Sequence, residues 1–248
     1  MKTYGLIGKN LSHTYSPNYF GEKFRRESIN ANYRVFDISD LSKFKELIDG
    51  NPNIKGLNVT IPYKKSICDY IDDIDPVAAL TGSVNTIRIE EYQGHKLLKG
   101  FNTDVIGFEE TIYPEIKSRE GIRAMILGTG GSANSVAYVM RKLGIECSFV
   151  SRRPINNTVY SYNQIGSEQM AKNKLIINTT PVGMFPNDNE YPNIPYENIT
   201  PDHILYDLIY NPHKTIFMSK GLVMGAKCIN GLKMLELQAE ASWKIWQK

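Results

Sequence analysis

The chain has 248 residues, of which 42% are hydrophobic and 22% charged, and its formal net charge is +3. This length and composition suit a globular protein of one large domain or two modest ones. Basic and acidic residues are interspersed, which argues against a nucleic-acid-binding face, and no apolar run reaches the roughly 20 residues of a membrane span. Three cysteines and four histidines are scattered without disulfide or metal-ligand spacing, so we expect reduced thiols, no metal site and a cytoplasmic location.

The first hundred residues alternate between strand-like and helix-like segments. Strands are predicted over 4–8, 33–37 and 56–60, helices over 16–28, 41–49 and 64–71, and a hairpin over 84–90 and 95–100. In the first helix, Ser16 is expected to be the N-cap and Pro17 the N1 residue. Alternating β and α units predict a mainly parallel sheet.

A second α/β series begins near residue 122, after a predicted helix over 104–118. Strands are expected over 123–127, 146–151, 175–178 and 204–207, with a helix over 133–143. The last predicted helix covers 231–246 and places Leu232, Leu235, Ala239 and Trp243 on one face. The chain is therefore predicted to fold as two α/β domains.

A glycine-rich turn follows the apolar strand 123–127. Gly128-Thr129-Gly130-Gly131-Ser132-Ala133 fits the pattern G-x-G-x-x-A between a strand and a helix. In this context the glycines permit a tight turn and a close approach to a pyrophosphate, which the N–H groups of the helix N-terminus can bind. A plain glycine turn is the alternative, but the strand–turn–helix order favours a dinucleotide.

The end of the next strand indicates which dinucleotide. NAD-binding enzymes usually carry Asp or Glu there, whereas this chain has Ser151-Arg152-Arg153. An arginine can bind a 2′-phosphate through two hydrogen bonds, so NADP is the predicted cofactor. A solvated basic loop is the alternative.

Polar residues follow three predicted strands in the first half of the chain. They lie in Asn58-Val59-Thr60-Ile61-Pro62-Tyr63-Lys64, in Val84-Asn85-Thr86 and in Gly100-Phe101-Asn102-Thr103-Asp104. Ligands of open α/β sheets bind at strand ends, so these segments are candidates for a substrate site.

With these motifs in order, the chain resembles the shikimate dehydrogenase family over essentially its whole length. The similar segments are 8–17, 58–64, 81–86, 102–104, 151–153, 178–184, 207–212, and 230–232 with Gln238. The resemblance implies reversible NADPH-dependent reduction of 3-dehydroshikimate to shikimate, on the route to chorismate and the aromatic amino acids. It also implies a substrate domain (1–103, completed by the C-terminal helix 232–248), a Rossmann-like NADP-binding domain (104–231) and a cleft between them.

The resemblance further implies roles for individual residues. Lys64 would donate the proton that the developing alkoxide needs, and Asp104 would orient Lys64. The implied substrate-binding residues are Thr14, Ser16, Asn58, Thr60, Asn85, Tyr210 and Gln238. The implied cofactor-binding residues are Gly128, Thr129, Gly130, Gly131, Ser132, Ala133, Ser151, Arg152, Arg153, Thr179, Gly183, Met184 and Gly231. A surface Lys–Asp ion pair, and polar side chains that only hold turns, are the structural alternatives.

Three residues depart from the family pattern. Asn10 stands where the family generally has proline, Thr14 replaces the usual first serine, and Arg153 replaces a threonine. The change at Thr14 leaves open a quinate/shikimate dehydrogenase with relaxed NAD or NADP use. A catalytically silent ligand-sensing paralogue is another alternative, although it predicts loss of Lys64 or Asp104. The expected partners are a small-molecule substrate, no nucleic acid and no membrane, in a monomer or homodimer.

Overall fold

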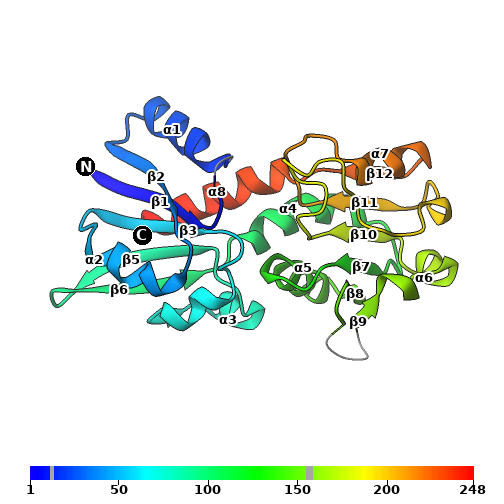
Figure 1. The fold of residues 1–248 in the computed structure, drawn as a ribbon, viewed down its shortest axis with the longest axis horizontal. Coiled ribbons are helices and arrows are strands. Elements are labelled where there is room, and N and C mark those ends of the chain that lie inside the picture. The colour runs from blue at the N-terminus through cyan, green and yellow to red at the C-terminus, as the bar shows by residue number, and fades with distance from the viewer. Residues whose placement is uncertain (12–13, 155–158) are drawn as a thin grey trace. The chain divides into compact units, whose positions relative to one another are not determined.

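The computed structural model describes residues 1–11, 14–154 and 159–248. These residues form two compact units, one of Met1–Thr103 with Ala239–Lys248 and the other of Asp104–Gln238. Each unit is built on its own six-stranded sheet with helices packed against it (Figure 1). The predicted α/β class with two sheets is confirmed.

The sheet of the first unit has the order β2-β1-β3-β5-β6-β4. Its three N-terminal strands are parallel, whereas the hairpin β5–β6 runs antiparallel to β3, so this sheet is mixed. The strands are β1 (Lys2–Gly8), β2 (Ala31–Asp37), β3 (Ile54–Val59), β4 (Asp73–Ile74), β5 (Thr86–Tyr92) and β6 (His95–Phe101).

Helices pack against the first sheet (Figure 1), and two separate apolar clusters lie between helices and sheet. In one, Phe20 and Phe24 of α1 (Ser16–Arg26) pack with Trp246 of α8 (Leu232–Trp246) around Tyr4. In the other, α2 (Phe44–Asp49) and α3 (Pro76–Thr81) join a core that contains Ile7, Leu57 and Ile87. Alternate side chains of β1 thus enter opposite layers, as the pleat of a strand requires.

The sheet of the second unit is parallel throughout, in the order β12-β11-β10-β7-β8-β9. Its strands are β7 (Ala124–Leu127), β8 (Cys147–Ser151), β9 (Val159–Ser161), β10 (Leu175–Asn178), β11 (Ile204–Asp207) and β12 (Lys227–Ile229). The helices of the unit are α4 (Asp104–Ile116), α5 (Gly131–Lys142), α6 (Ser167–Lys172) and α7 (Ile216–Val223). The central strands β7, β10 and β11 are wholly buried, which explains their continuous apolar sequences.

Two local predictions were wrong. The segment 64–71 was expected to be an α-helix, but it contains turns and a short 3-10 helix over Ser66–Tyr70. Ser16 was expected to cap α1, but the helix takes it in as its first residue, Tyr15 is the N-cap, and no side chain caps this end. The Ser16 side chain is instead buried and hydrogen-bonds to Tyr33.

The final helix α8 is shared between the units. Its residues up to Gln238 belong to the second unit and those from Ala239 onward to the first. Among the described helices, none combines the length and apolar character that a bilayer crossing needs.

Candidate functional site

In the first unit, the predicted residue Asn58 lies at the centre of a buried polar network. Asn58, near the end of β3, is only 4% exposed. Its Oδ1 accepts a hydrogen bond from the Tyr33 hydroxyl at 2.9 Å, and its Nδ2 donates to Ser242 Oγ at 2.9 Å. Burial raises the pKa of the Tyr33 phenol well above its usual value, although the Ser16 hydroxyl lowers it in part, so Tyr33 stays a neutral donor.

A second predicted asparagine joins the same network. The Asn85 Oδ1 accepts from the Thr103 backbone N–H at 2.7 Å, and its Nδ2 donates to the Thr103 hydroxyl at 3.0 Å. The Thr86 hydroxyl lies 3.1 Å from that of Thr103 and 2.8 Å from that of Ser242. The structure therefore brings Ser16, Asn58 and Asn85 into one connected cluster. Tyr33, Thr86, Thr103 and Ser242, which belong to it, were not predicted as site residues.

The loop that carries Thr14 begins with a hydrogen-bonded turn. The backbone N–H groups of Asn10 and Leu11 each donate to the Asp37 carboxylate at 3.0 Å, and Asn10 has a φ of 60°. Thr14 is half-buried. Ser12 and His13, which belong to the motif 8–17, lie outside the described residues.

The lysine motif follows β3 directly. Thr60 is half-buried and its backbone N–H donates to Ile7 O at 3.0 Å, so β1 holds the start of the turn. Lys64 is half-buried as well, and its carbonyl accepts from Val84 N–H at 2.8 Å. Lys64 belongs to the first unit, whereas Asp104 is the first residue of α4 and of the second unit and is 4% exposed. Their pairing stays a prediction.

The glycine turn of the second unit has the geometry that the sequence indicates. Gly128 follows β7 with a φ of 109°, a backbone conformation that residues other than glycine rarely adopt. Gly130 is the N-cap of α5. A Cβ at Gly130 would meet no described atom within 4 Å, so packing within the protein does not account for this glycine. Ala133 is fully buried at the contact of helix and sheet. The turn thus leaves open space at the N-terminus of a twelve-residue helix, where N–H groups can bind phosphate.

Two arginines follow β8, the strand that pairs with β7. Ser151 Oγ accepts from the backbone N–H of Arg153 at 3.1 Å and so shapes the turn. Arg152 and Arg153 are exposed, and neither forms an ion pair within residues 1–11, 14–154 and 159–248. The positive charge of Arg152 lies near Tyr162. Burial raises the pKa of Tyr162, and the charge of Arg152 partly lowers it again. Exposed guanidinium groups at this position suit a ligand with an additional phosphate.

The remaining predicted cofactor residues lie in loops that follow β10 and β12. The Thr179 hydroxyl donates to Leu127 O at 2.6 Å, which ties its loop to the strand before the glycine turn. Gly183 is buried with a φ of 94°, and Met184 is half-buried. Gly231 is buried against the backbone of Leu208, and a Cβ at this position would clash with the Leu208 carbonyl. Thr129, Gly131 and Ser132 are half-buried in the turn itself.

Two predicted substrate residues also belong to the second unit. Tyr210 is half-buried and Gln238 is 8% exposed.

The second unit also contains a buried carboxylate to which the sequence had assigned no role. Asn178 and Asp207 face each other in register at the ends of β10 and β11, and Asn178 Nδ2 donates to Asp207 Oδ1 at 3.0 Å. Thr215 and the Ile209 N–H donate to the same carboxylate at 2.6 and 3.1 Å. Burial raises the pKa of Asp207 to about 6, although these three hydrogen bonds each lower it in part. The sequence pattern that could have identified this buried pair is a polar residue at the end of each of two apolar strands.

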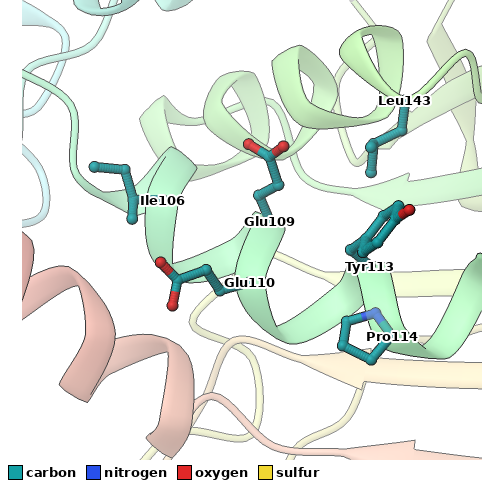
Figure 2. Close-up of a pocket in the computed structure, with 6 residues that line it drawn as sticks. All are labelled: Ile106, Glu109, Glu110, Tyr113, Pro114 and Leu143. Carbon is teal, nitrogen blue, oxygen red and sulfur yellow. The ribbon is translucent and has the colours of Figure 1, made fainter.

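A separate hollow of about 550 Å³ lies over α4 (Figure 2). It is lined by Ile106, Glu109, Glu110, Tyr113, Pro114 and Leu143. None of the predicted site residues lines it, and Glu109 is already paired with Lys142 at 2.7 Å. Across the described part of the chain, no three His, Cys, Asp or Glu side chains gather as metal ligands would.

Comparison with known proteins gives consistent matches over the whole chain. Residues 6–87 match the model of the shikimate dehydrogenase substrate binding domain. The shikimate dehydrogenase (NADP(+)) of Methanococcus aeolicus is 36% identical, with 99% of this chain and 91% of that protein covered. The crystal structure of shikimate dehydrogenase 1 from Peptoclostridium difficile is 36% identical with a TM-score of 0.84, covering 100% of this chain and 92% of the other. A shikimate dehydrogenase solved with NADP+ is 32% identical with a TM-score of 0.85, covering 99% and 89%.

Proposed function

The chain belongs to the shikimate dehydrogenase family, and we propose that it reduces 3-dehydroshikimate to shikimate reversibly with NADPH. The observation that carries the proposal is the full-length likeness to NADP(+)-dependent enzymes in a chain that keeps both Lys64 and Asp104. The reaction belongs to the route to chorismate and the aromatic amino acids.

We propose a division of labour between two domains. Residues 1–103 with the C-terminal helix 232–248 would bind the substrate, and residues 104–231 would bind NADP. The buried hydroxyl and amide groups around Asn58 and Asn85 support the first assignment, because a ring with several hydroxyls needs fixed donors and acceptors. The open turn at Gly130 and the exposed guanidinium of Arg152, which forms no ion pair with a described residue, support the second.

The chemistry follows from the residues on the substrate side. NADPH supplies the hydride that reduces the ketone carbon. We propose that the cationic Lys64 donates a proton to the carbonyl oxygen as negative charge develops there, and takes it back in the reverse reaction. Asp104 would accept a hydrogen bond from Lys64 and from a substrate hydroxyl. Thr14 and Ser16 would hold the substrate carboxylate, and Thr60, Tyr210 and Gln238 would contact the ring.

The cofactor residues have complementary tasks in this proposal. The N–H groups from Gly128 to Ala133 would bind the pyrophosphate, with Thr129, Gly131 and Ser132 in the turn. Arg152 and Arg153, with Ser151, would bind the 2′-phosphate. Thr179, Gly183, Met184 and Gly231 would also contact the cofactor. We also propose a cytoplasmic enzyme that acts as a monomer or homodimer.

The decisive test is a steady-state assay of the purified full chain. We expect shikimate oxidation with NADP+ to exceed quinate oxidation and to exceed any rate with NAD+. A preference for quinate and NAD+ would instead identify a quinate/shikimate dehydrogenase. NADPH binding by calorimetry without turnover of either acid would identify a ligand-sensing paralogue.

A further inference from the structure

A serine on the last helix lies within hydrogen-bonding distance of the proposed substrate-binding asparagine. Ser242 is fully buried, on the part of α8 that belongs to the first unit. Its hydroxyl accepts from Asn58 Nδ2 at 2.9 Å and lies 2.8 Å from the hydroxyl of Thr86. We propose that Ser242 is a positioning residue that fixes the side-chain amide of Asn58 toward the substrate. This inference rests on the proposed function.

The orientation of the Asn58 amide is set from both ends. Tyr33 donates to Oδ1 and Ser242 accepts from Nδ2, so the oxygen and the nitrogen each have a partner of the matching kind. An amide oxygen has two acceptor positions, and Tyr33 occupies one of them. No other described residue donates to this oxygen, so its second position can accept from a substrate hydroxyl.

Removal of the Ser242 hydroxyl weakens one side of this arrangement. Among the described residues, the amide nitrogen then keeps the Thr86 hydroxyl at 3.3 Å and the Asn85 carbonyl at 3.4 Å as its acceptors. The two orientations of an asparagine amide have nearly the same shape, so hydrogen bonds alone select between them. In the rotated orientation an NH2 group would meet the substrate hydroxyl where the oxygen should be.

Ser242 also connects α8 to the second asparagine. Its hydroxyl lies 3.1 Å from that of Thr103, whose backbone N–H donates to Asn85 Oδ1. The hydroxyl of Ser242 is therefore shared by the groups that orient Asn58 and Asn85. A change at Ser242 reaches the substrate site through these neighbours and not by contact with the substrate itself.

The test is the variant Ser242→Ala, which shortens a buried side chain without adding volume. We expect KM for shikimate to rise about 10-fold, equivalent to about 1.4 kcal/mol, while KM for NADP+ stays as in the wild type. The matched control is Glu240→Gln, two residues earlier on α8, because Glu240 contacts Tyr19 and Lys23 rather than Asn58. The control is expected to lower Tm and leave KM for shikimate unchanged.

A double-mutant cycle separates positioning from simple loss of stability. If Ser242 acts through Asn58, Ser242→Ala changes KM little when it is added to Asn58→Ala. An equal effect in both backgrounds, or an active enzyme in which Ser242→Ala leaves KM for shikimate unchanged, overturns the positioning role alone. Absence of turnover in the wild type overturns the proposed function, and this role with it.

Discussion

The Asp37 carboxylate holds the backbone of Asn10, whose N–H donates to Oδ1 at 3.0 Å while Asn10 adopts a φ of 60°. Proline, which the family pattern has here, lacks the N–H and has a φ near −65°. This chain therefore anchors the backbone of Asn10 and Leu11 by a side chain from the end of β2. Asparagine is one of the few residues that adopt this conformation readily.

This relationship predicts opposite outcomes for two substitutions at residue 10. Asn10→Gly keeps the N–H and the positive φ, so we expect a stability close to that of the wild type. Asn10→Pro loses both and is expected to destabilise the first unit by about 2 kcal/mol. Urea unfolding followed by tryptophan fluorescence measures this, because Trp243 and Trp246 both lie in that unit. Equal midpoints for the two variants would contradict the prediction.

Lys64→Ala is expected to lower kcat by about 100- to 10,000-fold, because the alkoxide loses its proton donor. Binding of shikimate, measured by calorimetry, should change much less. Lys65→Ala is the matched control, since it removes an exposed lysine from the adjacent position. Near-normal turnover in Lys64→Ala would remove Lys64 from its proposed role.

Arg152→Ala is expected to raise KM for NADP+ about 10-fold through loss of one charge-assisted interaction with the 2′-phosphate. KM for NAD+ should not change, because NAD+ lacks that phosphate. Arg141→Ala, in the last turn of α5, serves as the control for loss of a positive charge in the same unit. A parallel rise for both cofactors would argue against recognition of the 2′-phosphate.

Asp207 predicts a pH dependence of stability in the second unit. Its pKa is raised from 3.8 to about 6, so the folded state holds this proton more tightly than the unfolded chain does. The resulting stability is complete below about pH 4 and is lost as the pH rises through about 6, with a total on the order of 2–3 kcal/mol.

The variant Asp207→Asn removes this titration and keeps a similar shape. We expect the free energy of unfolding of the wild type to fall relative to the variant between about pH 4 and about pH 7. Circular dichroism is the appropriate probe, because the tryptophans report on the other unit. A difference between the two proteins that does not vary with pH would show that Asp207 keeps the same charge over this range.

The strands of the second unit were predictable because they are buried on both faces. Continuous apolar runs predicted β10 and β11 with the bounds that the structure shows, Leu175–Asn178 and Ile204–Asp207. Short elements such as α7 and β12 were not predicted. The helix α7 has no marked apolar face, and β12 has three residues and exists through its pairing with β11.

The candidate site was predictable only where chemistry leaves a local pattern. The glycine turn, the arginines after β8 and the lysine motif are short strings with a known physical purpose. Ser242 is 184 residues from Asn58 in the sequence, and Tyr33 is 25 residues away. Nothing in a sequence window relates such residues, because tertiary packing alone brings their hydroxyls to the amide. The wrong N-cap at Ser16 has the same cause, since Tyr33 binds its hydroxyl.

The return of α8 to the first unit determines the order in which the chain can fold during synthesis. Trp246 closes the apolar layer around Tyr4, and its indole N–H donates to Ile87 O at 3.0 Å. These contacts require Ala239–Lys248 to leave the ribosome, whereas Asp104–Gln238 has emerged by then. The first unit therefore completes its apolar layer only after the second unit has been synthesised, and in a nascent chain the layer around Tyr4 stays incomplete until Trp246 has emerged.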